Sequence, residues 1–312
     1  MTATHPAGGR EISPTRRHRS VPAGRRGPLP AGRRANGRRR LPASALRYLV
    51  LTVGAAIMVL PFAYMVSTSF KSQTYVLSLP PQFVPHPATT ANYSQAWTGD
   101  DFSRYFVNSL VVAVASTALS LLLSSMMAYS FARFRFPGRE AMFKLLLLGL
   151  MIPAMMLIIP QFVLAKYLHL IDSMAGLVLF YVGSSLSLNT FLLRGFFAAI
   201  PVELEQAMQV DGAGAIVRYW RLILPLARPA LATATIFTFL GSWDEFAWAL
   251  TIINTPSKRT LPIAIALFQG QNSTLWGLVF AASIIAVVPV IVVFLLFQRY
   301  FVQGLTAGAV KG

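Results

Sequence analysis

Residues 203–214 read ELEQAMQVDGAG, and the contrast between this stretch and its flanks decides the class of fold. The twelve residues contain three acids, two amides and two glycines, whereas runs of Leu, Phe, Ile and Ala lie on either side. Of the 312 residues, 55% are hydrophobic and 12% are charged, about half the charged share of a soluble domain. The mean hydropathy is +0.59. These values predict an all-α integral membrane protein.

Six uncharged or nearly uncharged intervals are long enough to cross a bilayer, which takes roughly 20 apolar residues. They predict transmembrane helices at about 48–70, 105–132, 145–165, 173–193, 229–253 and 276–298. A helix is expected in each interval because the backbone in lipid must satisfy its own hydrogen bonds. Pro61, Pro153, Pro160 and Pro289 lie inside these intervals and are expected to kink the helices.

The distribution of basic residues predicts the orientation of the chain. With the N-terminus in the cytoplasm, 22 Lys and Arg residues fall on the cytoplasmic side and 5 fall outside. We therefore expect both termini to be cytoplasmic in a multi-pass protein of the cell membrane. The stretch 203–214 is then cytoplasmic, between the fourth and fifth spans.

The first 47 residues form a separate segment before the membrane domain, residues 48–312. This segment holds twelve Arg and one acid, Glu11, which gives a net charge of +11. It is also rich in Pro, Gly and Ala and has no apolar periodicity, so we expect it to be disordered. Such a tail can bind nucleic acid or anionic lipid. The simpler interpretation is a solvated arm that fixes the topology of the chain, so no nucleic-acid partner is expected.

The connection from Arg194 to Arg228 is long enough to carry structure of its own. Pro201 suits the first turn of a helix, and Gly212 offers the left-handed conformation that ends one. A second amphipathic piece, AIVRYWRLIL, then leads to Pro225. An amphipathic helix of this kind lies on the membrane surface, packs under its own bundle or docks into a groove on a partner. The acids and amides on its polar face disfavour the membrane surface.

The same connection, IPVELEQAMQVDGAGAIVRYWRLILPLARP, resembles the cytoplasmic loop of ABC importer permeases, with the pattern E-A-A, three residues, G, nine residues and I-x-L-P. Gln206, Ala207 and Met208 stand at the E-A-A positions, Gly212 at the glycine, and Leu224 with Pro225 at L-P. Residues 108–139, 150–164, 191–201 and the C-terminal QRYFVQGLTAGAVKG also resemble this family. The pattern over residues 48–312 is similar to the smaller permease subunit of maltose- and multiple-sugar-type importers.

The resemblance implies a subunit that forms half of a sugar pathway and contains a coupling helix between spans four and five. Its implied partners are a second permease subunit, a dimer of cytoplasmic ATP-binding subunits, an extracellular solute-binding protein, the sugar and the bilayer. ATP and Mg are implied on the ATPase, with no cofactor or catalytic residue in this chain. The residues implied to contact the ATPase are Glu205, Gln206, Ala207, Met208, Asp211, Gly212, Ala213, Leu224 and Pro225.

The loop departs from the family pattern at two positions. Gln206 replaces the glutamate that is implied to pair with a basic residue of the ATPase, which removes the charge-assisted part of that hydrogen bond. Glu205, one position earlier, is an alternative anchor. Met208 replaces an alanine and requires a wider pocket in the partner.

The fifth predicted span contains two acids, Asp244 and Glu245, next to Trp243. Ionisable groups inside a membrane are costly and are therefore candidates for function. They are expected to face the pathway or the second subunit; the structural alternative is a polar cap at a kink. Asn189 in the fourth span is a further pathway candidate.

Other classes of function fit the sequence less well. An importer for a non-sugar solute has the same architecture. A secondary transporter often shows inverted repeats, which are not evident here. A membrane enzyme needs clustered catalytic residues, and the chain has no cysteine and only four scattered histidines, so no metal site is expected. The phosphate-binding pattern G-x-x-x-x-G-K-[ST] does not occur in the sequence.

Overall fold

The computed structural model describes residues 43–309 except residues 77, 79, 81, 100 and 271–273. These residues form helices joined by turns, with isolated bridges between Lys71 and Ala88 and between Gln269 and Thr274. The all-α class is confirmed. Most of the predicted disordered tail, residues 1–42, lies outside the described residues.

The chain divides into two compact units, residues 1–53 and 54–312. Helix α1 (Ala43–Ser69) begins in the first unit and contains Pro61 without a break. The further α-helices are α2 (Ala91–Thr98), α3 (Phe102–Arg133), α4 (Arg139–Leu148), α5 (Ile158–Tyr167), α6 (Met174–Ala199), α7 (Val202–Val210), α8 (Ala215–Arg218), α9 (Leu224–Leu226), α10 (Arg228–Trp243), α11 (Ala247–Ile252), α12 (Leu261–Leu267) and α13 (Trp276–Ala309). Short 3-10 turns cover Gln73–Tyr75, Ala154–Leu157 and Pro256–Lys258, and one π turn covers Tyr219–Ile223.

Four described helices are long and apolar enough to cross a membrane: Ala45–Ser69, Phe102–Arg133, Met174–Ala199 and Trp276–Tyr300. They coincide with the first, second, fourth and sixth predicted spans. A bent pair, Ala215–Leu226 and Arg228–Trp243, makes a fifth candidate with an angle of 79° at the break. The count of six spans stays a prediction.

The third predicted span, 145–165, is wrong as a single helix. Helix α4 ends at Leu148, and α5 begins only at Ile158. Two features account for the break. The hydroxyl of Ser187 on α6 donates to the carbonyl of Leu146 (2.8 Å) and holds the end of α4 in place. Pro153 then lacks an N–H for helical pairing and disfavours the helical conformation of the residue before it.

The fifth predicted span, 229–253, is also divided. Helix α10 ends at Trp243 and α11 begins at Ala247. The Glu245 carboxylate accepts hydrogen bonds from the backbone amides of Trp248 (2.8 Å) and Ala249 (3.0 Å). A side chain that satisfies the free amides of a helix start favours a new helix over continuation of the old one.

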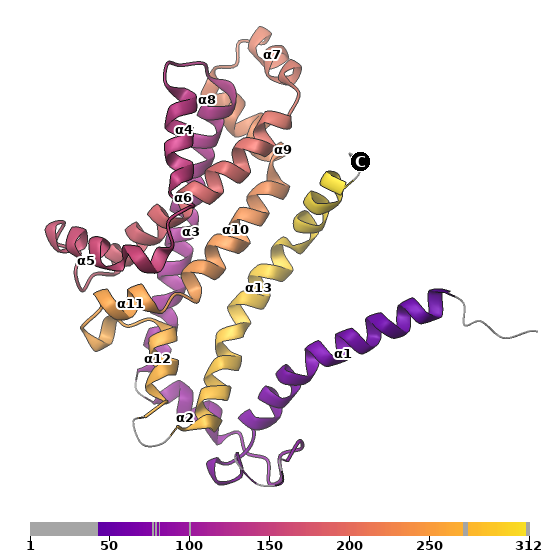
Figure 1. Ribbon diagram of the computed structural model, residues 1–312, viewed down its shortest axis with the longest axis vertical. Helices are drawn as coiled ribbons and strands as arrows, with labels where there is room; N and C mark the ends of the chain where they lie inside the picture. The colour runs from indigo at the N-terminus through magenta and orange to yellow at the C-terminus, as the bar shows by residue number, and fades with distance from the viewer. Residues whose placement is uncertain are drawn as a thin grey trace, which may run out of the picture. The chain divides into compact units, whose positions relative to one another are not determined.

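Helices α3, α6, α10 and α13 run side by side and form the centre of the second unit (Figure 1). Small residues allow α3 and α6 to approach closely, and a polar seam joins three of the helices. The Asn189 amide on α6 donates to Ser120 on α3 (3.0 Å) and to Thr238 on α10 (2.8 Å). All three side chains are buried. Such hydrogen bonds hold membrane helices together where lipid supplies no hydrophobic driving force.

Replacement of this amide is expected to weaken the bundle. Asn189→Ala should lower the free energy of unfolding by about 1 kcal/mol, because two buried hydroxyls lose a donor. Thermal unfolding of the detergent-solubilised protein measures the effect. Asn254→Ala removes an exposed amide as the matched control, and an equal midpoint for the two variants would contradict the role of the seam.

Candidate functional site

Helix α7 lies beyond the bundle, at the end where α6 finishes and α10 starts (Figure 1). It begins after Pro201 and carries Glu203 and Glu205 in its first turn, where acids complement the helix dipole. It ends at Val210, and Gly212 follows with φ +83°. The amides of Gly212 and Ala213 close this turn by donating to Gln209 (3.0 Å) and Met208 (2.9 Å). The predicted helix and its glycine terminus are confirmed as local structure.

The chain returns to the bundle through a short, irregular helical segment. Pro225 has no N–H to donate to the preceding turn, and the residues before it form a π turn in which Leu224 donates to Tyr219. Tyr219 and Ile223 are buried in an apolar cluster with Leu193 and Phe197 of α6. Leu224 and Pro225 therefore help to fix the connection between α7 and α10.

An apolar surface is exposed around α7. Val210 is 88% exposed and Ile216 is 75% exposed, with Val202, Leu204 and Trp220 also exposed. Exposed apolar groups gathered at one end of a protein are typical of an interaction site. The predicted contact residues around them fall into two groups: Gln206, Ala207, Asp211, Gly212 and Pro225 are exposed, and Met208, Ala213 and Leu224 are half-buried.

Glu205 differs from the other predicted contact residues because its side chain is buried. Its carboxylate forms an ion pair with Arg133 of α3 (2.5 Å) and a longer one with Arg218 of α8 (3.9 Å). The hydroxyl of Tyr129 donates to it at 3.2 Å. Sequence reasoning did not identify Tyr129, Arg133 or Arg218 as its partners, since no spacing connects residues that far apart.

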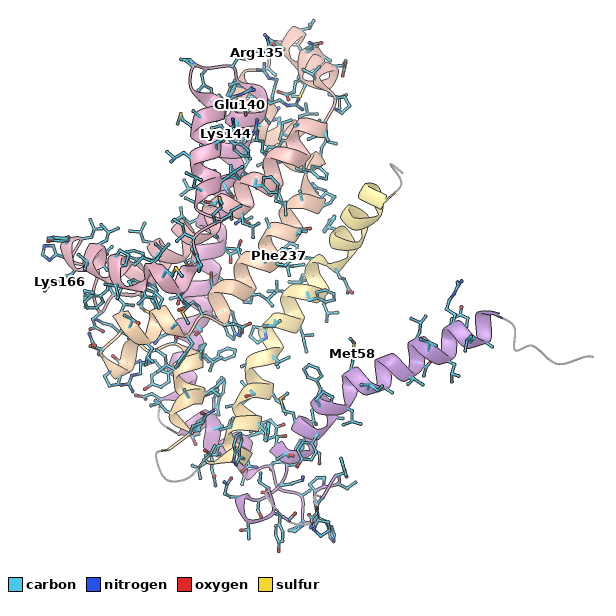
Figure 2. The ribbon with its side chains drawn as sticks, viewed as in Figure 1. Met58, Arg135, Glu140, Lys144, Lys166 and Phe237 are labelled. Atoms are coloured by element: carbon cyan, nitrogen blue, oxygen red, sulfur yellow. The ribbon has the colours of Figure 1, made fainter. Side chains whose placement is uncertain are left out.

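Other charged side chains gather at the same end of the bundle. Figure 2 shows Arg135, Glu140 and Lys144 there, on α4 and the turn before it. Glu140 pairs with Arg139 (2.8 Å) and with Arg194 of α6 (2.9 Å). The pKa of the Glu140 carboxyl is lowered, first by its hydrogen bond from Arg139.

The two acids of the fifth predicted span have different surroundings. Glu245 accepts a hydrogen bond from the hydroxyl of Tyr181 on α6 (2.8 Å) while it caps α11. Asp244 is exposed and faces a hollow of about 430 Å³. Trp243, Asp244, Phe246, Leu261, Pro262, Ile265, Ala266, Gln269 and Ala286 line this hollow. The indole of Trp243 is fixed by a hydrogen bond to the Ala286 carbonyl (3.1 Å).

Asn189 lies inside the chain, where both of its hydrogen bonds go to neighbouring helices. It therefore does not join Trp243 and Asp244 at the hollow. Within the described ranges, no group of three or more His, Cys, Asp or Glu side chains is arranged to hold a metal ion.

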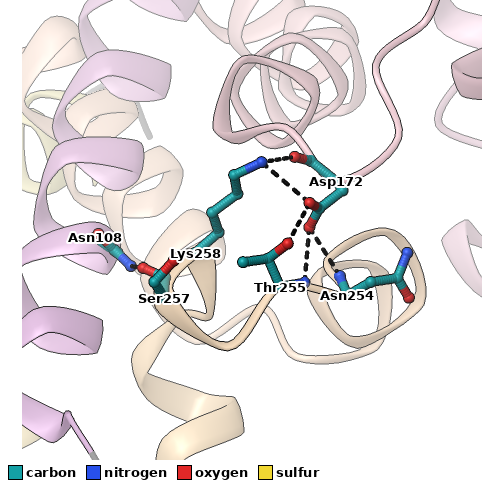
Figure 3. Close-up of polar contacts among 6 residues, drawn as sticks. All are labelled: Asn108, Asp172, Asn254, Thr255, Ser257 and Lys258. Carbon is teal, nitrogen blue, oxygen red and sulfur yellow. Dashed lines mark hydrogen bonds and ion pairs between the residues drawn. The ribbon is translucent and has the colours of Figure 1, made fainter.

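Away from α7, Asp172 joins the turn before α6 to the segment after α11 (Figure 3). Its carboxylate accepts hydrogen bonds from the backbone amides of Asn254 (3.0 Å) and Thr255 (2.9 Å). It also accepts from the Thr255 hydroxyl (2.6 Å) and the Lys258 ammonium (3.0 Å). Asn108 of α3 fixes the same segment by donating to Ser257 and Arg259 (both 2.9 Å). Sequence reasoning missed Asp172, which has no motif around it.

Comparison with known proteins identifies the family. Residues 120–307 match the family described as binding-protein-dependent transport system inner membrane component. The chain belongs to this family. It is a multi-pass membrane permease component, and the polar loop that contains α7 lies within the matched residues.

Full-length relatives agree with this assignment. The permease is 35% identical over 267 residues to the sulfoquinovosyl glycerol transport system permease protein SmoH of Agrobacterium fabrum, covering 86% of this chain and 94% of the relative. It is 37% identical to the trehalose transport system permease protein SugB of Mycobacterium tuberculosis, covering 84% and 95% of the two chains. The trehalose/maltose transport system permease protein MalG of Thermococcus litoralis is 34% identical, with 86% and 98% covered.

A solved structure shares the fold. A chain of a bacterial ABC transporter involved in the import of the acidic polysaccharide alginate superposes with a TM-score of 0.72 at 24% identity. The superposition covers 83% of the permease and 96% of that chain.

The bonds around Asp172 predict a pH dependence. Hydrogen bonds to the carboxylate, first from the Thr255 hydroxyl, hold the pKa of Asp172 well below its usual range. A carboxyl whose folded pKa is lowered stabilises the fold above the unfolded pKa of about 3.9 and loses this contribution as the pH falls toward the folded pKa. Asp172→Asn should therefore lower the unfolding midpoint at pH 7, and its gap from the wild type should close below a pH of about 4.

Thermal unfolding across this pH range tests the prediction. Asp101→Asn, at an exposed acid in the turn before α3, is the control. If the difference in unfolding midpoint between Asp172→Asn and the wild type stays constant with pH, the carboxylate charge contributes nothing to stability.

Proposed function

We propose that the permease is one of two membrane subunits of an ATP-driven carbohydrate importer. The observation that carries the proposal is the match, over most of the chain, to relatives described as permease proteins for sulfoquinovosyl glycerol, trehalose and maltose. In this proposal both termini and α7 are cytoplasmic, in agreement with the distribution of basic residues. The segment that carries Asp172 and Lys258 then faces the extracellular side.

Helix α7 is proposed to be the coupling helix, which fits a cleft on a separate ATPase dimer. The exposed apolar side chains around it, above all Val210 and Ile216, suit a hydrophobic groove. Gln206 and Ala207 are exposed beside them. ATP and Mg belong to the ATPase in this proposal, and the permease converts closure of the ATPase into movement of its helices.

The hollow beside Asp244 is proposed to be part of the pathway of the sugar. A free carboxylate accepts hydrogen bonds from sugar hydroxyls, and aromatic side chains such as Phe246 supply flat apolar surface beside it. Trp243 supports the wall through its bond to Ala286. Glu245 is occupied by Tyr181 and the start of α11, so its proposed contribution is to hold Asp244 at the break between helices.

A second permease subunit completes the pathway in this proposal, and an extracellular solute-binding protein delivers the sugar. The description of the family includes dependence on a binding protein. A related solved complex contains an alginate pentasaccharide-bound periplasmic protein. The proposed docking surface for such a protein includes the segment fixed by Asp172.

Reconstitution with one component omitted at a time tests the proposal. We expect sugar uptake into proteoliposomes only when the permease, the second permease, the ATPase, the binding protein and ATP are all present. Uptake by the permease alone, driven by an ion gradient, would instead establish a secondary transporter. ATP-dependent uptake of a non-sugar solute, with no sugar transported, would establish the importer but not its substrate class.

Restoring the family acid on α7 is expected to strengthen coupling. Gln206→Glu should raise the apparent affinity of the permease for its ATPase by about fivefold, the equivalent of about 1 kcal/mol for a charge-assisted hydrogen bond. Binding-protein-stimulated ATP hydrolysis at limiting ATPase concentration measures the change. Unchanged activity would show that position 206 makes no coupling contact.

Neutralising the free acid at the hollow is expected to slow transport. Asp244→Asn should lower the uptake rate at low sugar concentration by about tenfold, because the amide oxygen still accepts a hydrogen bond from the sugar but without the negative charge that strengthens it. Assembly with the ATPase should be unchanged. Asp101→Asn again provides the control, and equal uptake by both variants would remove Asp244 from the pathway.

A further inference from the structure

Helix α7 is attached to the protein in an unusual way. Of its nine residues, the buried one is an acid, Glu205, which is 7% exposed. The apolar residues Val202, Leu204 and Val210 face outward instead. Most surface helices are held by an apolar face that packs on the core, so α7 depends on a different kind of contact.

That contact is a group of charges at the end of α3. Arg133 pairs with one oxygen of the Glu205 carboxylate (2.5 Å), while Arg218 and the Tyr129 hydroxyl approach the other at 3.9 and 3.2 Å. The side chains of Arg133 and Arg218 are themselves 12% and 14% exposed. A carboxylate removed from water is tolerated only when it is paired, and here two cations and a hydroxyl surround it.

The same arginines fix both ends of α7. Arg133 also donates to the carbonyl of Ile200, immediately before the helix (2.7 Å). Arg218 donates to the carbonyl of Ala213, in the glycine turn immediately after it (2.9 Å). Glu205 therefore lies between two arginines that each hold one of the turns bounding α7.

We propose that Glu205 is the positioning residue that carries the movement of α7 into α3 through Arg133. The inference rests on the proposed function of α7 as the coupling helix. Turns at Ile200–Pro201 and at Asp211–Gly214 separate α7 from α6 and α8, so no continuous helix joins it to the bundle. The ion pair joins it to α3 instead, so displacement of α7 by a partner displaces the end of a helix that runs through the whole bundle.

The burial of Glu205 separates this role from direct contact with the ATPase. Its carboxylate points into the chain, whereas the side chain of Gln206 is exposed on the same helix. Glu203, two residues earlier, is an exposed acid and supplies a matched control for loss of one negative charge from α7.

The test compares Glu205→Gln with Glu203→Gln in the complete transport complex with its ATPase, second permease and binding protein. Sugar transported and ATP hydrolysed are both measured per assembled complex. We expect Glu205→Gln to lower the sugar transported per ATP by about fivefold or more, and Glu203→Gln to leave the ratio unchanged. Glu205→Asp, which keeps the charge on a shorter side chain, should lower the ratio by a smaller factor than Glu205→Gln. If Glu205→Gln does not assemble, Glu205→Asp is compared with Glu203→Gln, and a wild-type ratio in Glu205→Asp would then overturn the inference.

A distance measurement tests the positioning itself. The chain has no native cysteine, so spin labels are introduced at Val210 of α7 and Met126 of α3, both exposed. The distribution of label distances should broaden in Glu205→Gln and stay narrow in Glu203→Gln. An unchanged distribution, or a wild-type ratio of sugar to ATP in Glu205→Gln, would overturn the inference. Failure of the wild-type complex to transport sugar would instead overturn the proposed function.

Discussion

The fold depends on how membrane helices are held together where lipid removes the usual hydrophobic driving force. In this permease the answer is a buried polar seam, in which Asn189 bridges Ser120 and Thr238 and so joins α6 to α3 and α10. Ser120 also meets Ser185 of α6 at 2.6 Å. These short side chains let the helices approach closely and give them specific partners. The seam therefore ties three helices directly to one another.

Charged groups then fix segments that lie outside these three helices. Glu205 and Arg133 join α7 to α3, and Asp172 and Lys258 join the turn before α6 to the segment after α11. Helix α3 contacts both segments, through Arg133 at one and Asn108 at the other, so one helix connects the proposed ATPase surface to the proposed binding-protein surface. The pathway candidate Asp244 lies at the break between α10 and α11.

Features that arise from neighbouring residues could be predicted from the sequence, whereas features that depend on contacts between residues far apart in the chain could not. Helix α7 and its terminus at Gly212 follow from residues within one turn, and hydropathy alone located the long spans. The break in the third interval is indicated in part by Pro153, but it also depends on Ser187, and the inward orientation of Glu205 depends on Arg133, 72 positions away in the chain. The contacts of Ser187 and Arg133 leave no pattern in the sequence, and the same holds for Asp172 and its partners.

The central claim is that α7 is the surface through which an ATPase drives this permease. A photo-crosslinking amino acid at Val210, which is 88% exposed on α7, measures this directly in the assembled complex. Val84, 77% exposed in the segment before α2, is the control position. The account predicts an adduct between position 210 and the ATPase subunit and none from position 84. Adducts from position 210 to lipid or to the second permease, with none to the ATPase, would contradict it.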